Sequence, residues 1–378
     1  MSETPQTAAQ IPPQVPLQAA PGVTQTRVAF LIPGDLSLPT GGYGYDRRIL
    51  ARLPAYGIDV AHVQVPGSYP SPSAADLAAT EAVIAGLPDN HVLLIDGLAY
   101  GAMGFDLVSR IRQPIVALCH HPLAMEAGLD DARQAQLKLS ERNALSRARH
   151  VVVTSRMTAR ILAEDFGVNA DSILVAEPGT DRSQRAKGSI NGHDGPPHLV
   201  AVGSIVPRKG YDVLIRALTP MTDRPWTLSI VGAARDTELL ATLERQAAEA
   251  GLSDRIRWLG ARTEADLDDI YASADIFVMP SLFEGYGMVL GEAMARGLPI
   301  VCTTGGAAAE TAPNAAALKV PPGDAAAFSA ALARVLDDAK LRASMSDAAW
   351  SAGLMLPTWD DAAKRIAAVL KAVGRRLG

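Results

Sequence analysis

Residues 276–292 read IFVMPSLFEGYGMVLGE, and this stretch governs the interpretation of the rest of the chain. An apolar run is followed by two carboxylates, Glu284 and Glu292, with Gly285 and Gly287 between them. The pattern predicts a buried strand, a glycine turn that lets a ligand approach the backbone, and a helix whose free N–H groups suit an anion. A carboxylate near such a turn can accept hydrogen bonds from vicinal hydroxyls, as on a ribose.

The same alternation of short apolar runs and amphipathic segments extends outward over most of the chain. The apolar runs are RVAFLI, IDVAHVQV, HVLLID, PIVALC, HVVVTS, SILVA, HLVAVG, WTLSIVG, RIRWLG, ADIFVMP, LPIVC and AALKV. Helices are expected at about 45–56, 74–86, 132–146, 157–166, 211–218, 237–250, 264–272, 288–295, 325–337 and 359–377. Continuous apolar strands alternating with helices predict an α/β protein with two doubly wound, Rossmann-like parallel sheets.

Composition marks the domain boundaries. Residues 1–26 are rich in Pro, Gln, Ala and Thr and predict a disordered tail. A first domain is expected over 27–187, a Gly/Pro-rich linker over 188–197 and a second domain over 198–356, before a last helical segment over 357–378. Because such sheets bind ligands at the carboxyl ends of their strands, we expect the two domains to face a shared cleft.

The overall composition excludes some classes of partner. The chain has 378 residues, 48% hydrophobic and 20% charged, with a formal net charge of −5, which gives no electrostatic reason to bind nucleic acid. Cys119 and Cys302 each end an apolar run and are expected to be small buried hydrophobes, which fits a reducing cytoplasm. We find no secretory leader and no membrane-spanning run, and peripheral membrane contact stays open.

A second motif, in the other half of the same domain, strengthens a resemblance to a known protein family. Residues 201–210 read AVGSIVPRKG and follow the first strand of the second domain. With the E-x7-E spacing of Glu284 and Glu292 in its FEGYG context, this resembles the retaining glycosyltransferases of family 4, which have the GT-B fold. The resemblance covers about 27–376, and in this family the last helix crosses back onto the first domain. Further matches are Gly179, Asp181, Val231, Gly232, Gly260, Gly305, Gly306, Glu310, Trp359 and Asp360.

The resemblance implies a nucleotide-sugar site on the second domain. Arg208 and Lys209 match the pair that holds the donor diphosphate, and stabilising that leaving group would make them catalytic in effect. Glu292 would hold the ribose, and Glu284 would contact the donor sugar. The expected donor-binding residues are Gly41, Gly42, Gly203, Arg208, Lys209, Gly232, Glu284, Gly285, Tyr286, Gly287, Met288, Val289 and Glu292.

The first domain carries two further motifs. Residues 39–45, PTGGYGY, resemble the family's glycine-rich loop beside the donor phosphate, and they lack the G-x-G-x-x-G spacing of dinucleotide sites. After the strand PIVALC, His120 matches the family's histidine next to the reacting sugar, with His121 as a close rival. On this basis His120 joins Arg208, Lys209 and Glu284 as a catalytic candidate. Glu126 either lines the acceptor side or is a surface residue.

The expected reaction is transfer of a hexosyl group from a nucleoside-diphosphate sugar, with UDP favoured and GDP-mannose next. The acceptor would be a glycan, lipid or small molecule, and the product would retain the anomeric configuration. No metal or other cofactor is expected, because the D-x-D match at Asp266 and Asp268 falls within a predicted helix. The alternatives are a sugar-nucleotide epimerase or phosphorylase of the same fold and a non-catalytic scaffold, with a nicotinamide oxidoreductase disfavoured by the missing fingerprint.

Overall fold

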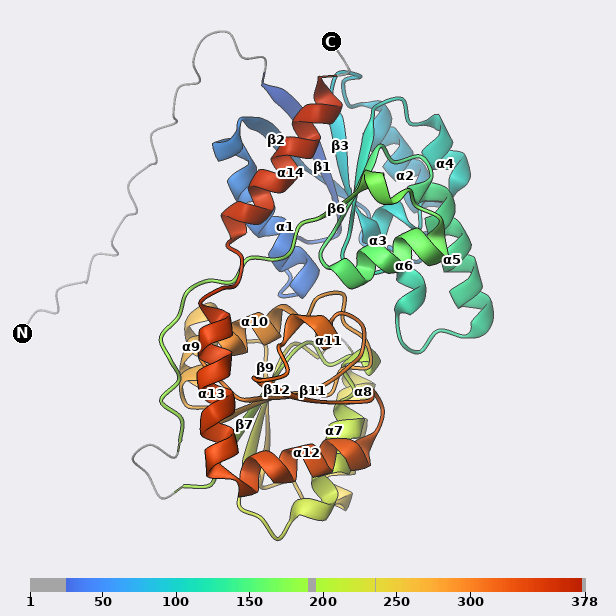
Figure 1. The fold of residues 1–378 in the computed structure, drawn as a ribbon. Coiled ribbons are helices and arrows are strands. Elements are labelled where there is room, and N and C mark those ends of the chain that lie inside the picture. The colour runs from blue at the N-terminus through green and yellow to red at the C-terminus, as the bar shows by residue number, and fades with distance from the viewer. Residues whose placement is uncertain (1–24, 190–194, 235, 376–378) are drawn as a thin grey trace, which may run out of the picture.

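The computed structural model describes residues 25–189, 195–234 and 236–375, which form two α/β domains stacked one on the other (Figure 1). Each domain is built on a parallel sheet in which the described residues supply six strands. The strand order is β2-β1-β3-β4-β5-β6 in the first sheet and β12-β11-β10-β7-β8-β9 in the second. The predicted fold class, two doubly wound parallel sheets, is therefore confirmed.

The first sheet is buried between helices on both of its faces. Its strands are β1 (Thr26–Pro33), β2 (Ile58–Val65), β3 (Val92–Asp96), β4 (Ile115–Cys119), β5 (His150–Val153) and β6 (Ile173–Val175). Its helices are α1 (Gly41–Arg52), α2 (Ala74–Ala85), α3 (Gly97–Tyr100), α4 (Phe105–Arg110), α5 (Asp131–Leu145) and α6 (Arg156–Phe166). The central strands β3 and β4 are buried at every position, which is why they read as unbroken apolar runs.

The second sheet repeats this design. Its strands are β7 (His198–Val202), β8 (Thr227–Val231), β9 (Ile256–Gly260), β10 (Ile276–Met279), β11 (Ile300–Thr303) and β12 (Ala317–Val320). Its helices are α7 (Tyr211–Leu218), α8 (Thr237–Glu249), α9 (Glu264–Ala272), α10 (Met288–Ala295), α11 (Ala308–Thr311), α12 (Ala325–Asp337) and α13 (Ala339–Gly353). The last helix, α14 (Trp359–Gly374), leaves this domain.

Some predicted boundaries were wrong. Helix α1 begins at Gly41 and not at residue 45, because the Thr40 side chain caps the N–H of Tyr43 and so the glycine-rich segment forms the first helical turn. Helix α13 was not predicted. Thr26, assigned to the tail, is the first residue of β1 and pairs with Ile58. The rest of the predicted tail, up to residue 24, and most of the predicted linker lie outside the described residues.

Helix α14 completes the core of the first domain, as expected for the last helix. The Thr358 side chain caps its start, and its buried stripe runs from Trp359 to Val373. That stripe packs with residues of α1 and β1, such as Ile49 and Phe30, in one hydrophobic cluster. Figure 1 shows α14 lying beside α1 on the first domain. The apolar face of α14 thus covers one side of the first sheet, although the helix follows the whole second domain in sequence.

The chain crosses between the domains twice, and the two crossing segments contact each other. The N–H of Thr180 donates to the carbonyl of Pro357 over 3.0 Å. Gly179 lies so close to the start of α14 that a Cβ there would come within 2.0 Å of the Trp359 backbone nitrogen. Beyond this point the first crossing segment pairs with the second domain, through Ala186 N–H to Arg296 and Lys187 N–H to Ala272.

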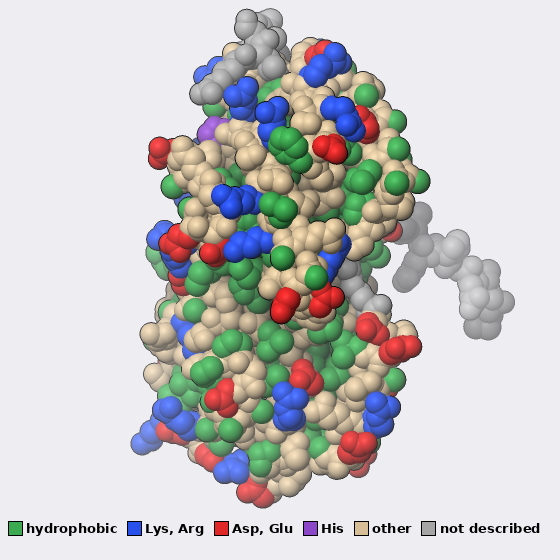
Figure 2. Space-filling view, turned by 90° about the vertical axis from the view of Figure 1, so that its right-hand side faces the viewer, with side chains coloured by type: hydrophobic (Ala, Val, Ile, Leu, Met, Phe, Trp, Pro, Cys, Tyr) green, Lys and Arg blue, Asp and Glu red, His purple; other side chains and the backbone are tan. Residues whose placement is uncertain are grey.

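The surface carries charges of both signs. On the face seen in Figure 2, Lys and Arg side chains are interspersed with Asp and Glu over both domains.

Cys119 and Cys302 are free and buried, as predicted from their place at the ends of apolar runs. Of the helices the structure describes, none combines the length and the hydropathy that crossing a bilayer requires.

The close approach at Gly179 generates a prediction. We expect Gly179→Ala to lower the free energy of unfolding by about 1–3 kcal/mol, because the methyl group must push α14 away from the first domain. Thermal and chemical denaturation measure it. Gly195→Ala is the matched control, since a Cβ there meets no atom within 4 Å. Equal stability of the two variants would contradict the tight packing of the crossing.

Candidate active site

The carboxyl ends of the two sheets face each other at the boundary between the domains, which is called the cleft below, and the glycines of residues 276–292 make their close approach possible. A Cβ on Gly285 would come within 2.1 Å of the His120 carbonyl oxygen, so the turn after β10 lies directly against the end of β4. Thr158 donates to the Gly285 carbonyl over 3.3 Å. At the start of α1, a Cβ on Gly41 would lie 3.5 Å from the Met288 side chain.

Glu284 is buried among cations of its own domain. Its Oε1 accepts from Lys209 Nζ and from Ser281 Oγ, each at 2.6 Å, and its Oε2 lies 3.4 Å from Arg208 Nη1. Burial alone would raise the pKa of Glu284, but Lys209 and Arg208 outweigh it and lower the pKa to about 2. Glu284 is therefore an ionised, fixed carboxylate that keeps the two expected diphosphate-binding cations in place.

Arg208 also links the two domains. Its Nη1 donates to the Phe283 carbonyl over 2.7 Å, and its Nε donates to Glu126 Oε1 over 3.1 Å. Glu126 in turn lies 3.2 Å from His121 Nε2. Although burial works to raise the pKa of Glu126, His121 and Arg208 hold it below its usual range. Of the three acceptor-side candidates, His120, His121 and Glu126, the structure therefore brings Glu126 to Arg208 directly and His121 to Arg208 through Glu126.

Both cations keep unused hydrogen-bond donors. The contacts of Arg208 in the described residues involve Nε and Nη1, and Lys209 has the single carboxylate partner Glu284. Nη2 of Arg208 and two of the three ammonium hydrogens of Lys209 are thus available to an anion. The site can donate hydrogen bonds to a phosphate group without breaking the ion pairs with Glu284.

Glu292 has different surroundings from Glu284. It lies in the second turn of α10, is partly buried, and accepts a hydrogen bond from the Tyr271 hydroxyl at 2.9 Å. Burial raises the pKa of Glu292, although the Tyr271 hydrogen bond and the nearby Arg296 work to lower it. The two glutamates of the motif are therefore separate groups, one neutralised by cations and one set against a tyrosine.

Backbone geometry explains the other donor-side residues. Gly287 precedes α10 with a φ of +84°, and a Cβ on Gly232 would lie 1.9 Å from the Gly203 carbonyl, so both positions require glycine. Tyr286 is buried, and Val289 packs partly buried on the second core. Glu310, after the Gly305 turn, forms an ion pair with Arg160 of the first domain.

His120 faces two buried carboxylates of the first domain. Its Nε2 lies 3.1 Å from Asp46 Oδ1 and 3.4 Å from Asp96 Oδ2. Its ring packs on Gly42, whose Cβ would lie 3.3 Å from Cδ2, and meets the Tyr45 ring edge-on at 5.3 Å. The three polar groups offer atoms within 4.8 Å of one another, which is also the composition of a cation site.

Sequence reasoning missed the residues that hold the predicted ones. Ser281 and Tyr271 support the two glutamates, and Asp46 and Asp96 support His120. Asp96 could have been found, because it is a polar residue at the carboxyl end of a buried parallel strand. The D-x-D match is correctly placed within a helix, where Asp268 pairs with Arg296.

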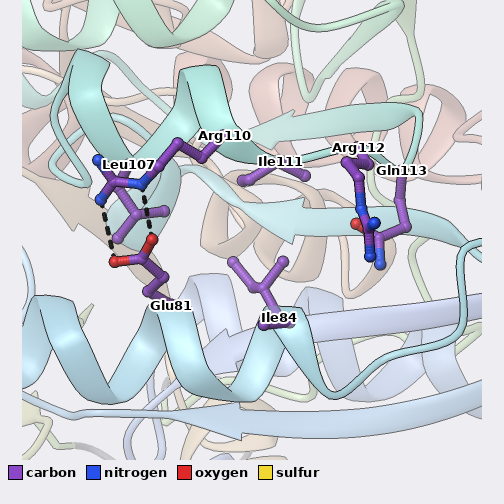
Figure 3. A pocket seen from close by; sticks show the side chains of 8 residues that line it. Glu81, Ile84, Leu107, Arg110, Ile111, Arg112 and Gln113 are labelled. Carbon is purple, nitrogen blue, oxygen red and sulfur yellow. Dashed lines mark hydrogen bonds and ion pairs between the residues drawn. The ribbon is translucent and has the colours of Figure 1, made fainter.

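Two surface hollows of the first domain lie away from this cleft. One, of about 180 Å³, lies between the ends of α2 and α4, where Figure 3 shows Arg110 paired with Glu81 beside Ile84. The other, of about 410 Å³, includes Arg147 and Arg149 just before β5. Both lie at the amino ends of the strands, so neither belongs to the site assembled above.

Comparison with known families gives two matches. The family described as Glycosyl transferases group 1 matches residues 183–351, and the one described as Glycosyltransferase Family 4 matches residues 89–184. Together these ranges include the cation pair, both glutamates of the motif and His120.

Curated relatives show the same similarity at moderate identity. The D-inositol 3-phosphate glycosyltransferase of Nocardia farcinica is 29% identical over 256 residues, covering 63% of this chain and 57% of that protein. The protein of the same description in Corynebacterium aurimucosum is 31% identical over 269 residues, covering 66% and 64%. The match spans less than two thirds of the length of both relatives.

Solved structures share the fold. Sucrose-phosphate synthase from Thermosynechococcus elongatus superposes with a TM-score of 0.78 at 21% identity, covering 93% of this chain and 100% of that chain. Anabaena Alr3699/HepE, in complex with UDP and glucose, superposes with a TM-score of 0.72 at 20% identity, covering 91% and 99%. At this identity the likeness establishes the two-domain architecture.

The buried Glu284 cluster generates a pH-dependent prediction. Because its pKa is lowered to about 2, ionised Glu284 stabilises the fold fully above its ordinary value of 4.5, and this contribution is lost as the pH falls toward 2. We expect Glu284→Gln to cost about 3–5 kcal/mol near pH 7, where it leaves Lys209 without a carboxylate partner and Arg208 with Glu126 alone, and less near pH 3.

Denaturation at both pH values measures this difference. Glu264→Gln is the matched control, since Glu264 is a 92% exposed side chain in a 3.4 Å pair with Arg48 and should change stability by less than about 0.5 kcal/mol. A Glu284→Gln deficit that stayed the same at pH 3 would show that the ion pairs are not its source.

Proposed function

Because the chain belongs to glycosyltransferase family 4, with the GT-B fold, we propose that it transfers a hexosyl group from a nucleoside-diphosphate sugar to a hydroxyl-bearing acceptor. The observation that carries the proposal is the pair Arg208 and Lys209, fixed by buried Glu284 at the carboxyl end of the second sheet, with hydrogen-bond donors to spare. A paired cation site at this edge suits a diphosphate.

The donor would lie on the second domain. Arg208 and Lys209 would take the diphosphate, and the free N–H groups at the start of α10, after Gly287, would add positive potential. Glu292, partly buried one turn further along, would accept hydrogen bonds from the ribose hydroxyls. These groups supply free hydrogen-bond donors and local positive potential to the diphosphate, so we propose that no metal ion is required.

Bond breaking places negative charge on the departing diphosphate. Cations already held in position by Glu284 stabilise that charge without reorganising, which lowers the barrier to transfer. The contacts of Gly285 with His120 and Thr158 show how close the domains can come, and such closure excludes water that would hydrolyse the donor.

The acceptor would bind on the first domain, beside His121 and Glu126. Glu126 already contacts Arg208, so an acceptor hydroxyl at this place would lie next to the sugar–phosphate bond. We propose a UDP-linked hexose as the donor, with GDP-mannose next. The structure of the same fold that contains UDP and glucose supports UDP.

Donor binding is the first test. We expect calorimetry with UDP, GDP, ADP and their sugar conjugates to find one preferred nucleotide. Arg208→Ala and Glu292→Gln should each weaken it by about 1.5–3 kcal/mol, because each removes a charge-assisted hydrogen bond. Arg216→Ala is the control, since Arg216 forms an exposed pair with Asp212 on α7. No binding, or binding unchanged in both variants, would contradict the donor site.

The stereochemistry of transfer is the second test. Glu284 is the carboxylate nearest the cation pair, and its engagement with Lys209, Ser281 and Arg208 makes it a poor covalent nucleophile. We therefore expect front-face transfer, in which NMR of the product shows the anomeric configuration of the donor. An inverted product would refute this. Donor turnover at the same rate without any acceptor would favour the epimerase or phosphorylase alternative.

A further inference from the structure

Behind the cleft, two carboxylates share one ring nitrogen. Asp46 comes from the second turn of α1 and is 0% exposed, while Asp96 ends β3 and is 2% exposed. Both approach Nε2 of His120, at 3.1 Å and 3.4 Å. Ionised carboxylates only accept hydrogen bonds, so where Asp46 and Asp96 are both ionised Nε2 carries the hydrogen, which fixes the tautomer of any neutral form.

The ring cannot turn away from this arrangement. Gly42 packs on one side of it, with a Cβ position 3.3 Å from Cδ2, and Tyr45 sets its ring edge-on at 5.3 Å. A flip of the imidazole would place a C–H group against the two carboxylates. Residues 42, 45 and 46 all belong to α1, so the start of this helix fixes the orientation of the His120 ring.

The second ring nitrogen has a different environment. Within the described part of the chain, Asp46 Oδ2 is the single buried side-chain oxygen or nitrogen without a hydrogen-bond partner. Nδ1 of His120 makes no hydrogen bond there and is not such a buried atom, so it is accessible to solvent. The backbone carbonyl of the same residue contacts Gly285 of the second domain, which places His120 at the boundary between the domains.

We propose that Asp46 and Asp96 hold His120 as an imidazolium whose Nδ1–H points into the cleft, and that Asp46 is the positioning residue for this fixed hydrogen-bond donor. The proposal rests on the proposed function only in naming what the donor meets, an oxygen of the nucleotide sugar. A doubly protonated ring has no free lone pair, so His120 positions the sugar and does not act as a base.

The electrostatics agree with this geometry. Burial of the ring disfavours its charge, but Asp46 and Asp96 outweigh that effect and raise the pKa of His120 to about 10. Burial also raises the pKa of Asp46 to about 7, with His120 opposing the rise and Asp96 adding to it, so Asp46 is mostly ionised at pH 8. These two carboxylates are the charged groups that face the ring, from α1 and from β3. Burial raises the pKa of the Tyr45 hydroxyl well above its ordinary value, so this side chain is neutral. From the second domain, the turn after β10 places the uncharged Gly285 against His120.

The test is the protonation state of His120 in the free protein, which needs no activity. With ¹⁵N-histidine labelling, and His120→Gln to assign the signal, we expect both ring nitrogens to show protonated shifts at pH 8. In Asp46→Asn the pKa should fall by about 1–3 units. Asp89→Asn, a surface carboxylate paired with Arg112, is the matched control and should leave the titration unchanged.

Activity adds a second, separable measurement. In Asp46→Asn we expect kcat at pH 8 to fall about tenfold or more and to recover as the pH is lowered, with a smaller change in the donor KM. A pH-independent loss would indicate a merely structural role and overturn the proposal. If the NMR titration behaves as expected while no sugar is transferred, the proposed function fails and the positioning role stands.

Two results would overturn the protonation state directly. One is a neutral His120 in the wild-type protein below pH 8, which can be measured even if Asp46→Asn does not fold. The other is a stoichiometric metal ion in the dialysed wild-type protein that is lost in Asp46→Asn, which would make Asp46, Asp96 and His120 a cation site.

Discussion

The hydrogen bond between Thr180 and Pro357 joins the two segments that cross between the domains, and the geometry of the cleft depends on it. One crossing leads out of β6 and the other leads into α14, so joining them sets the first sheet over the second. Parallel strands bring all their carboxyl ends to one edge, and the crossing turns these edges toward each other. Glycine is required at position 179, where the segments touch, because any side chain there would overlap the backbone at the start of α14.

Buried charges organise the cleft from both sides. On the second domain, one carboxylate is surrounded by Lys209 and Arg208, and on the first domain one imidazole is surrounded by Asp46 and Asp96. Each arrangement compensates a charge that burial would otherwise disfavour, and each leaves hydrogen-bond donors free toward the cleft. Glu126 of the first domain contacts Arg208 of the second domain, so a carboxylate also bridges the two domains.

The sequence predicted the strands to within a residue or two because buried parallel strands are continuous apolar runs with clear ends. It failed on α13, whose sequence AKLRASMSDAAWSAG mixes small, polar and apolar residues without a clear stripe. It also placed the start of α1 too late, since glycines suggest a loop unless a cap such as Thr40 is recognised. The cleft residues at strand ends were predictable, whereas Asp46 was not, because its role depends on a strand 74 residues away.

The contact between Gly285 and the His120 carbonyl makes the positions of the two domains depend on each other. A methyl group at residue 285 would lie 2.1 Å from that oxygen, and the clash would force the two domains apart. Residue 285 needs no side chain to act on a substrate, yet its size limits the depth to which the cleft can shut. Any shift of the backbone after β4 would therefore require a matching shift of the turn after β10. These two loops, one from each domain, are sterically coupled.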